Sequence, residues 1–97
     1  MTQFESIKAT IQELKPELYN KYGVSSIGLF GSIVRDDFSP GKSDIDIIVD
    51  FSKPIGIEFI DLANFLEATF NIKIDLVSKN GIKDKYFQEI KSEIIYV

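Results

Sequence analysis

Hydrophobic residues in the first part of the chain recur at intervals of three and four. In residues 2–22 these positions are Phe4, Ile7, Ile11, Leu14 and Leu18. Such spacing places the side chains on one face of an amphipathic helix. Pro16 lies inside this pattern and has no N–H to donate, so we expect a kink, or a break with a second short helix starting near it. Gly23 is expected to end the helix.

A different pattern, alternation with a period of two, predicts strands. Residues 44–51 begin with strict alternation and are rich in β-branched side chains, so they predict the clearest strand. One face of this strand would carry Asp44, Asp46, Ile48 and Asp50, and the other would carry Ile45, Ile47, Val49 and Phe51. Residues 71–78 alternate in the same way, with Asp75 near the middle.

The other elements follow from shorter signals. Residues 25–30 predict a strand that ends in a Gly-Ser turn opening a short helix, and residues 36–43 predict a loop. Helical spacing returns in residues 57–70 and 83–92, and residues 94–97 predict a short last strand. We therefore expect one α/β (α+β) domain over residues 1–97. A small mixed sheet would have helices packed on one face, which leaves the carboxylate face open.

The composition restricts the chemistry. The 97 residues include no cysteine and no histidine, which excludes disulfides, thiol and imidazole catalysis, and zinc sites built on those ligands. A metal would have to bind oxygen ligands, which favours Mg²⁺, Mn²⁺ or Ca²⁺. The 44% hydrophobic content is sufficient for a packed core.

Charge and hydropathy indicate the partners and the location. The net charge of −4 argues against direct nucleic-acid binding, because that binding depends on neutralising phosphates. No apolar run approaches the ~20 residues that span a bilayer, and the first residues do not resemble a signal peptide. We expect a cytoplasmic protein without membrane contact.

Asp44 and Asp46 form an Asp-x-Asp pair on one strand face. Two carboxylates this close raise each other's proton affinity unless a cation neutralises them, so the pair indicates a metal site. An isolated pair of this kind is more often a solvated strand face. A calcium EF-hand is excluded, because Val49 and Ile55 occupy the positions where that loop needs Gly and Glu.

Two further features strengthen the metal interpretation. The corner at Gly31 and Ser32 offers backbone N–H groups and a hydroxyl to a phosphate, and glycine allows the phosphate a close approach. Asp75 supplies a third carboxylate on another predicted strand. Together these parts predict a site for a metal-bound nucleotide.

These residues resemble the signature of the nucleotidyltransferase superfamily. Leu29-Phe30-Gly31-Ser32, an eleven-residue spacer, Asp44-Ile45-Asp46 and the later Ile74-Asp75-Leu76 follow its Gly-Ser…Asp-x-Asp pattern. The chain is most similar to the minimal nucleotidyltransferases (MNT), the antitoxins of HEPN/MNT toxin–antitoxin pairs, over essentially its whole length.

The resemblance implies a role for each matching residue. Asp44, Asp46 and Asp75 match the catalytic, metal-binding carboxylates. The residues that match nucleotide-binding positions are Gly31, Ser32, Arg35 and Ser43. Asp36 stands where the family usually has glycine, and the spacer is one residue longer than usual. Lys42 in this spacer is a second candidate to neutralise phosphate, besides Arg35.

The activity implied is transfer of AMP from ATP to an acceptor hydroxyl with release of pyrophosphate, supported by two Mg²⁺ or Mn²⁺ ions. The resemblance further implies that the acceptor is a tyrosine of a HEPN toxin, which the chain would neutralise as its antitoxin. Two alternatives remain: an antitoxin that masks the toxin by binding alone, and a nucleotidyltransferase that modifies a small molecule. The oligomeric state stays open.

Overall fold

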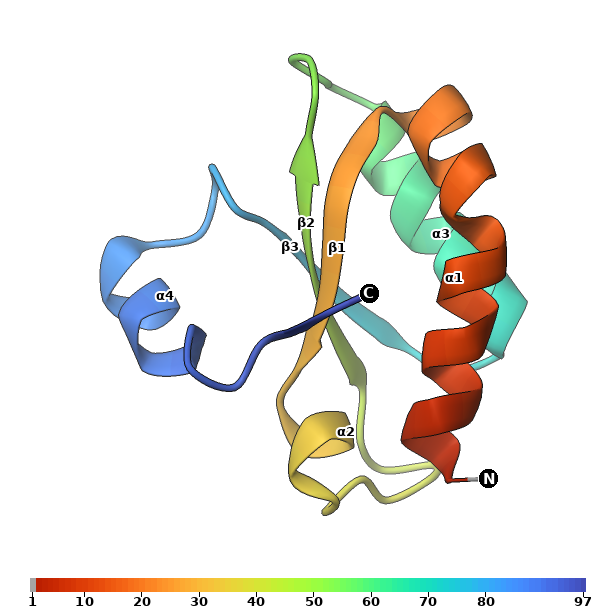
Figure 1. Cartoon of the computed structure of the whole chain (residues 1–97), viewed down its shortest axis with the longest axis vertical. Helices are drawn as coiled ribbons and strands as arrows, with labels where there is room; N and C mark the ends of the chain where they lie inside the picture. Colours follow the sequence, from red (N-terminus) through yellow and green to blue (C-terminus); the bar gives the residue numbers. More distant parts are fainter. Residues whose placement is uncertain (1) are drawn as a thin grey trace.

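A computed structural model describes residues 2–97, which form four helices and four strands (Figure 1). In chain order these are α1 (Gln3–Tyr22), β1 (Val24–Phe30), α2 (Ser32–Arg35), β2 (Ile45–Phe51), α3 (Glu58–Phe70), β3 (Ile74–Ser78), α4 (Asp84–Ile90) and β4 (Ile95–Tyr96). The predicted elements are thus all present, with ends shifted by a few residues. No helix in this part of the chain combines the length and hydropathy needed to cross a bilayer.

The long helix α1 is closed at both ends by local interactions. Thr2 and Glu5 form a capping box, and Gly23 ends the helix with a left-handed backbone at φ 72°. The predicted break at Pro16 is wrong, because α1 continues through it as one helix. Pro16 lies on the exposed side, where water can bind the carbonyl that proline leaves without a partner.

The four strands form one mixed sheet in the order β3-β2-β1-β4. β2 runs parallel to β3, whereas β1 is antiparallel to both β2 and β4. The parallel pair is joined through α3, which provides the crossover connection that parallel strands require. This arrangement agrees with the mixed sheet that the sequence predicts.

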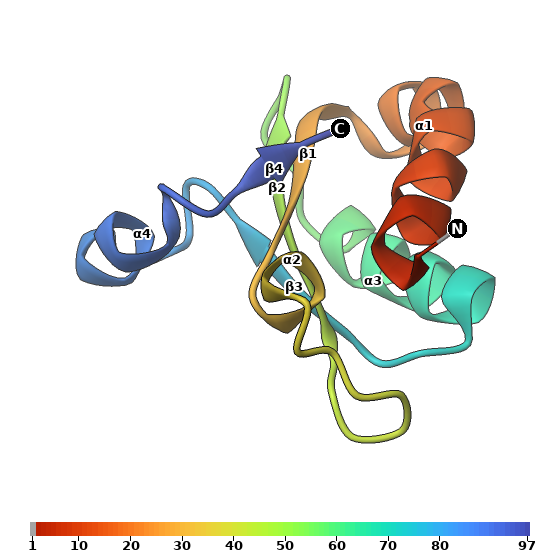
Figure 2. The same cartoon turned by 60° about the horizontal axis from the view of Figure 1, so that its bottom comes forward.

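Helices lie on both sides of this sheet, which differs from the expected packing on one face. α1 and α3 cover one face, while the short α4 stands on the other (Figures 1 and 2). The larger hydrophobic cluster joins α1 and α3 to the sheet and includes Ile11, Ile47 and Leu66, each fully buried. A smaller cluster of Phe30, Ile48 and Ile90 connects α4 to the opposite face. The carboxylate face is therefore partly covered instead of fully open.

Candidate active site

The register of the sheet places two of the predicted carboxylates side by side. Asp46 of β2 pairs with Asp75 of β3, and on its other side Asp46 pairs with Phe30 of β1. Paired residues project to the same face of a sheet, so Phe30, Asp46 and Asp75 form a row across three strands. We call these three residues the carboxylate row. The row lies on the face that also carries α4.

The carboxyl group of Asp46 has a raised pKa. Partial burial, followed by the negative charges of Asp75 and Asp44, raises its pKa from 3.8 to about 6, and Arg35 opposes this shift. When protonated, Asp46 can also donate a hydrogen bond to the Asp75 carboxylate, which raises the pKa of Asp46 further. A cation placed between these groups would remove the repulsion and stabilise the ionised form.

Gly31 brings the predicted phosphate corner against Asp46. Its backbone has φ 76°, and a Cβ atom at this position would overlap the Asp46 carboxylate. Only glycine satisfies both the left-handed conformation and the close approach. Ser32 begins α2 directly after it, so the first turn of α2 follows the corner that meets Asp46. The structure thus unites the corner with Asp46, as the sequence predicts.

Asp44 is placed less firmly than the strand pattern suggests. β2 begins at Ile45, so Asp44 lies just before the strand and is not held by its ladder. It remains near enough to raise the pKa of Asp46. Within residues 2–97, no three acidic side chains already converge in a group that could hold a metal ion. Asp44, Asp46 and Asp75 nevertheless provide the hard oxygen donors that Mg²⁺ prefers, and binding by all three would require their side chains to converge.

The other predicted nucleotide-binding residues have partners within the chain. Arg35 donates from one nitrogen to both carboxylate oxygens of Glu93, at 3.0 and 3.2 Å. The Ser43 hydroxyl accepts a hydrogen bond from the Ser39 amide and closes the loop before β2. A phosphate that binds Arg35 therefore has to displace Glu93 or bind the guanidinium together with it.

The backbone conformation at Asp36 explains why this position accepts a residue other than glycine. It ends α2 with a left-handed backbone at φ 66°. Glycine adopts this conformation most easily, but Asp and Asn visit it more often than other residues. The structure thus accommodates Asp36 in a conformation suited to glycine.

Tyr86 of α4 lies next to the carboxylate row, although no motif in the sequence marks it as a site residue. Its ring meets Phe30 edge to face, with centroids 6.3 Å apart. Partial burial, then Asp46 and Asp75, raise the pKa of its hydroxyl. No local signal could have revealed this, because the contact depends on which face of the sheet α4 covers.

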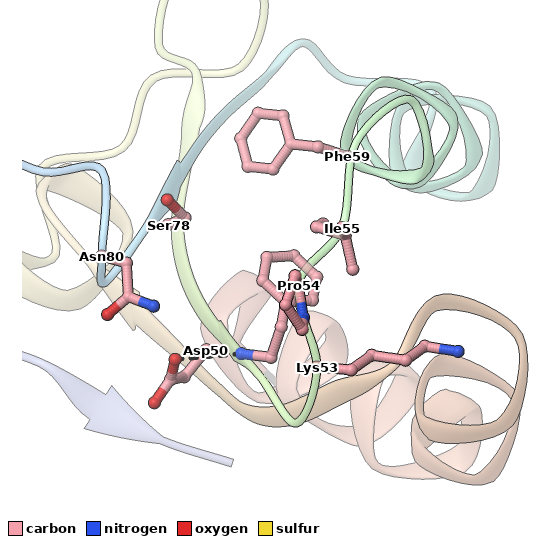
Figure 3. A pocket seen from close by; sticks show the side chains of 8 residues that line it. Asp50, Lys53, Pro54, Ile55, Phe59, Ser78 and Asn80 are labelled. Atoms are coloured by element: carbon pink, nitrogen blue, oxygen red, sulfur yellow. Dashed lines mark hydrogen bonds between the residues drawn. The ribbon is translucent and has the colours of Figure 1, made fainter.

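A separate cleft lies at the opposite end of β2 from Asp46. It has a volume of about 370 Å³ and is lined by residues that include Asp50, Phe59 and Asn80 (Figure 3). The Asp50 carboxylate accepts a hydrogen bond from the Phe51 amide, so it caps the strand end. Asp50 is thus separated from the carboxylate row, although both belong to the strand face that carries Asp46.

Comparison with known proteins defines the class of the molecule. Residues 11–97 match the family described as nucleotidyltransferase domain. The protein adenylyltransferase MntA of Thermococcus cleftensis is 38% identical over 98 residues, which cover all of this chain and 98% of that protein. The chain therefore belongs to the nucleotidyltransferase domain family, and the predicted enzyme class is confirmed.

Solved structures confirm the fold. A putative minimal nucleotidyltransferase superposes with a TM-score of 0.79 at 23% identity, covering 97% of this chain and 95% of that one. A complex described as tri-AMPylated Shewanella oneidensis HEPN toxin with MNT antitoxin gives 0.70 at 21% identity, covering 97% of this chain and 71% of the matched chain. The fold is thus that of minimal nucleotidyltransferases, as the resemblance implies.

Proposed function

We propose that this chain is a metal-dependent protein adenylyltransferase that transfers AMP from ATP to a tyrosine hydroxyl of a HEPN-domain toxin and thereby acts as its antitoxin. The observation that carries the proposal is the in-register contact of Asp46 and Asp75 beside the Gly31 corner. The name of the Thermococcus relative supports adenylyl transfer, and the Shewanella complex supports a HEPN partner.

The residues divide into a phosphate side and a metal side. Ser32 and the neighbouring amides at the start of α2 would hold the β- and γ-phosphates, because the first amides of a helix have no partner within it. Arg35, with Glu93 fixing one of its nitrogens, would neutralise phosphate charge from the side of α2. Lys42 and Ser43 lie in the loop before β2 and can approach the same ligand.

Asp44, Asp46 and Asp75 would hold Mg²⁺ or Mn²⁺, and a two-ion site would lower the pKa of the acceptor hydroxyl and stabilise charge on the leaving pyrophosphate. The acceptor oxygen forms a bond to the α-phosphorus while the bond to the β-phosphate oxygen breaks. Asp75, which is exposed, would accept the proton of the hydroxyl. Most of the rate enhancement would then come from positioning and charge stabilisation.

The test is co-expression with the HEPN protein, if one is encoded by the neighbouring reading frame, followed by incubation with α-labelled ATP and Mg²⁺. We expect label on the HEPN protein and neutralisation of its toxicity. Asp46→Ala should abolish both the label and any neutralisation that depends on it. Asp50→Ala is a matched control, since Asp50 is on the same strand face but at its far end.

Two results would contradict the proposal. Full neutralisation without transferred label would indicate that the chain masks its partner by binding alone. Label on a small-molecule hydroxyl, with none on the HEPN protein, would indicate the small-molecule alternative.

A further inference from the structure

One tyrosine of the chain itself stands beside the carboxylate row. β3 carries Asp75 and leads through a short turn into α4, which returns over the same face of the sheet (Figure 2). Tyr86 on α4 contacts Phe30, the member of the row next to Asp46. Tyr86 is 40% exposed, so the fold does not enclose its side chain. The effect of Asp46 and Asp75 on its pKa agrees with this position.

The element that carries Tyr86 is attached more weakly than the rest of the fold. α4 has seven residues and meets the sheet through the small cluster of Phe30, Ile48 and Ile90. The segment after α4 is linked to α2 by the ion pair of Arg35 and Glu93. Few buried contacts allow local adjustment at low free-energy cost. Tyr86 can thus shift over the row without disturbing the larger core.

The other three tyrosines do not share this position. Tyr22 is buried at 5% exposure at the end of α1. Tyr19 also lies on α1, which packs on the opposite face of the sheet. Tyr96 of β4 pairs with Gly28, so it lies two residues along β1 from Phe30 and on the strand farther from Asp46. Tyr86 is therefore the tyrosine placed at the carboxylates.

We propose that Tyr86 is an internal acceptor: in the absence of a partner, the chain transfers AMP from ATP to the hydroxyl of its own Tyr86. This inference rests on the proposed adenylyl transfer and extends it to a modification site on the enzyme. It requires no chemistry beyond that reaction, since Tyr86 offers the same phenolic group that the proposed partner offers.

The step balances as a displacement at phosphorus. The Tyr86 Oη atom forms a bond to the α-phosphorus of ATP while the bond between that phosphorus and the bridging oxygen to the β-phosphate breaks. Pyrophosphate leaves with the electron pair of this bond. The phenolic proton passes to the carboxylate of Asp75. The product is an AMP phosphodiester on Tyr86, which occupies the face where a partner tyrosine would otherwise enter.

The experiment incubates the purified full chain alone with ATP and Mg²⁺ and measures its intact mass and the modified peptide. We expect the mass of one adenylyl group, located on Tyr86. Tyr86→Phe should lose this adduct while keeping the ring that packs on Phe30, and its melting temperature reports whether the fold survives. Tyr96→Phe, a matched tyrosine on the edge strand, should keep the adduct, and Asp46→Ala should lose it.

A mixing experiment tests whether the transfer is internal. The Asp46→Ala chain retains Tyr86 and carries a mass tag that distinguishes it from the wild-type chain. The two chains are incubated together with ATP and Mg²⁺. Only the wild-type chain should be modified. Modification of the Asp46→Ala chain would overturn an internal transfer.

Different experimental results would overturn the internal acceptor and the proposed function. Label on the HEPN protein with no adduct on the chain, or an adduct that persists in Tyr86→Phe, overturns the internal acceptor and leaves the proposed function standing. Absence of transfer to both proteins overturns the proposed function and the internal acceptor together.

Discussion

The two faces of the sheet differ in how they are covered. The face under α1 and α3 is closed by a continuous hydrophobic cluster that includes the fully buried Ile47 and Leu62. The opposite face has a small cluster under α4 and, beside it, half-buried and exposed acids. Repulsion between those acids is tolerated because the first face supplies most of the buried apolar surface. The stability of the fold and the chemistry of the site thus reside on different faces.

The largest effect is expected from truncating the helix-covered face. Ile47→Ala removes a fully buried side chain at the centre of the larger cluster and should lower the free energy of unfolding by about 2–5 kcal/mol. Urea denaturation followed by circular dichroism measures this loss. A decrease below about 1 kcal/mol would contradict the assignment of this face as the main source of stability.

A smaller effect is expected from the same truncation under α4. Ile90→Ala should cost about 2 kcal/mol or less, because the small cluster has few buried members and its partly buried neighbours can move into the space. Hydrogen exchange should accelerate mainly in residues 84–90. If Ile90→Ala and Ile47→Ala lowered the free energy of unfolding equally, the two clusters would form one cooperative unit.

The carboxylate row should make stability depend on pH. The folded-state pKa of Asp46, about 6, exceeds 3.8, so the folded protein binds the proton more tightly than the unfolded chain. Stability should therefore rise as the pH falls from 7 to 4, in the absence of metal. Because Asp46 is only partly buried and solvent screens its charge, we expect only about 1 kcal/mol.

Asp46→Asn provides the matched comparison for this pH effect. The substitution should remove the pH-dependent contribution of Asp46 to stability. The variant should therefore be more stable than the wild type at pH 7 by a similar amount. Urea unfolding between pH 4 and pH 7 measures both proteins. An unchanged pH profile in Asp46→Asn would show that another group is responsible.

The smallest effect concerns the ion pair at the edge of the site. Glu93→Gln should change the free energy of unfolding only slightly, since the guanidinium of Arg35 is exposed and water screens the ion pair. Thermal unfolding measures this change. In the proposed enzyme, the released Arg35 should alter the KM for ATP more than kcat, and an equal change in both would contradict a role in nucleotide binding.

The sequence predicts local features well and long-range features less well. Alternation in residues 44–51 and helical spacing in residues 57–70 identify β2 and α3, because each pattern depends on the burial of one face. The Gly31 corner and Asp46 are likewise predictable from their motif. Pro16 shows the limit of a local rule, since its exposure determines whether the helix continues.

Features that depend on distant segments could not be predicted in the same way. The pairing of Asp46 with Asp75 requires the register of two strands that are joined through α3. The position of Tyr86 requires knowing on which side of the sheet α4 packs, and the short pattern of residues 84–90 contains no such information. The engagement of Arg35 by Glu93 has the same origin, because Glu93 follows α4.

The parallel pairing of β2 with β3 also has a consequence for the order of folding. β1 and β2 are antiparallel neighbours joined by one loop and α2, whereas Asp75 reaches Asp46 only after α3 has crossed the sheet. Closing a longer loop costs more chain entropy, so contacts of this kind form late. During synthesis, Asp46 and Asp75 cannot meet until β3 has left the ribosome. The acidic pair is therefore expected to form after Phe30 has paired with Asp46, whereas the pairing of β1 with β4 closes a still longer loop and should follow it.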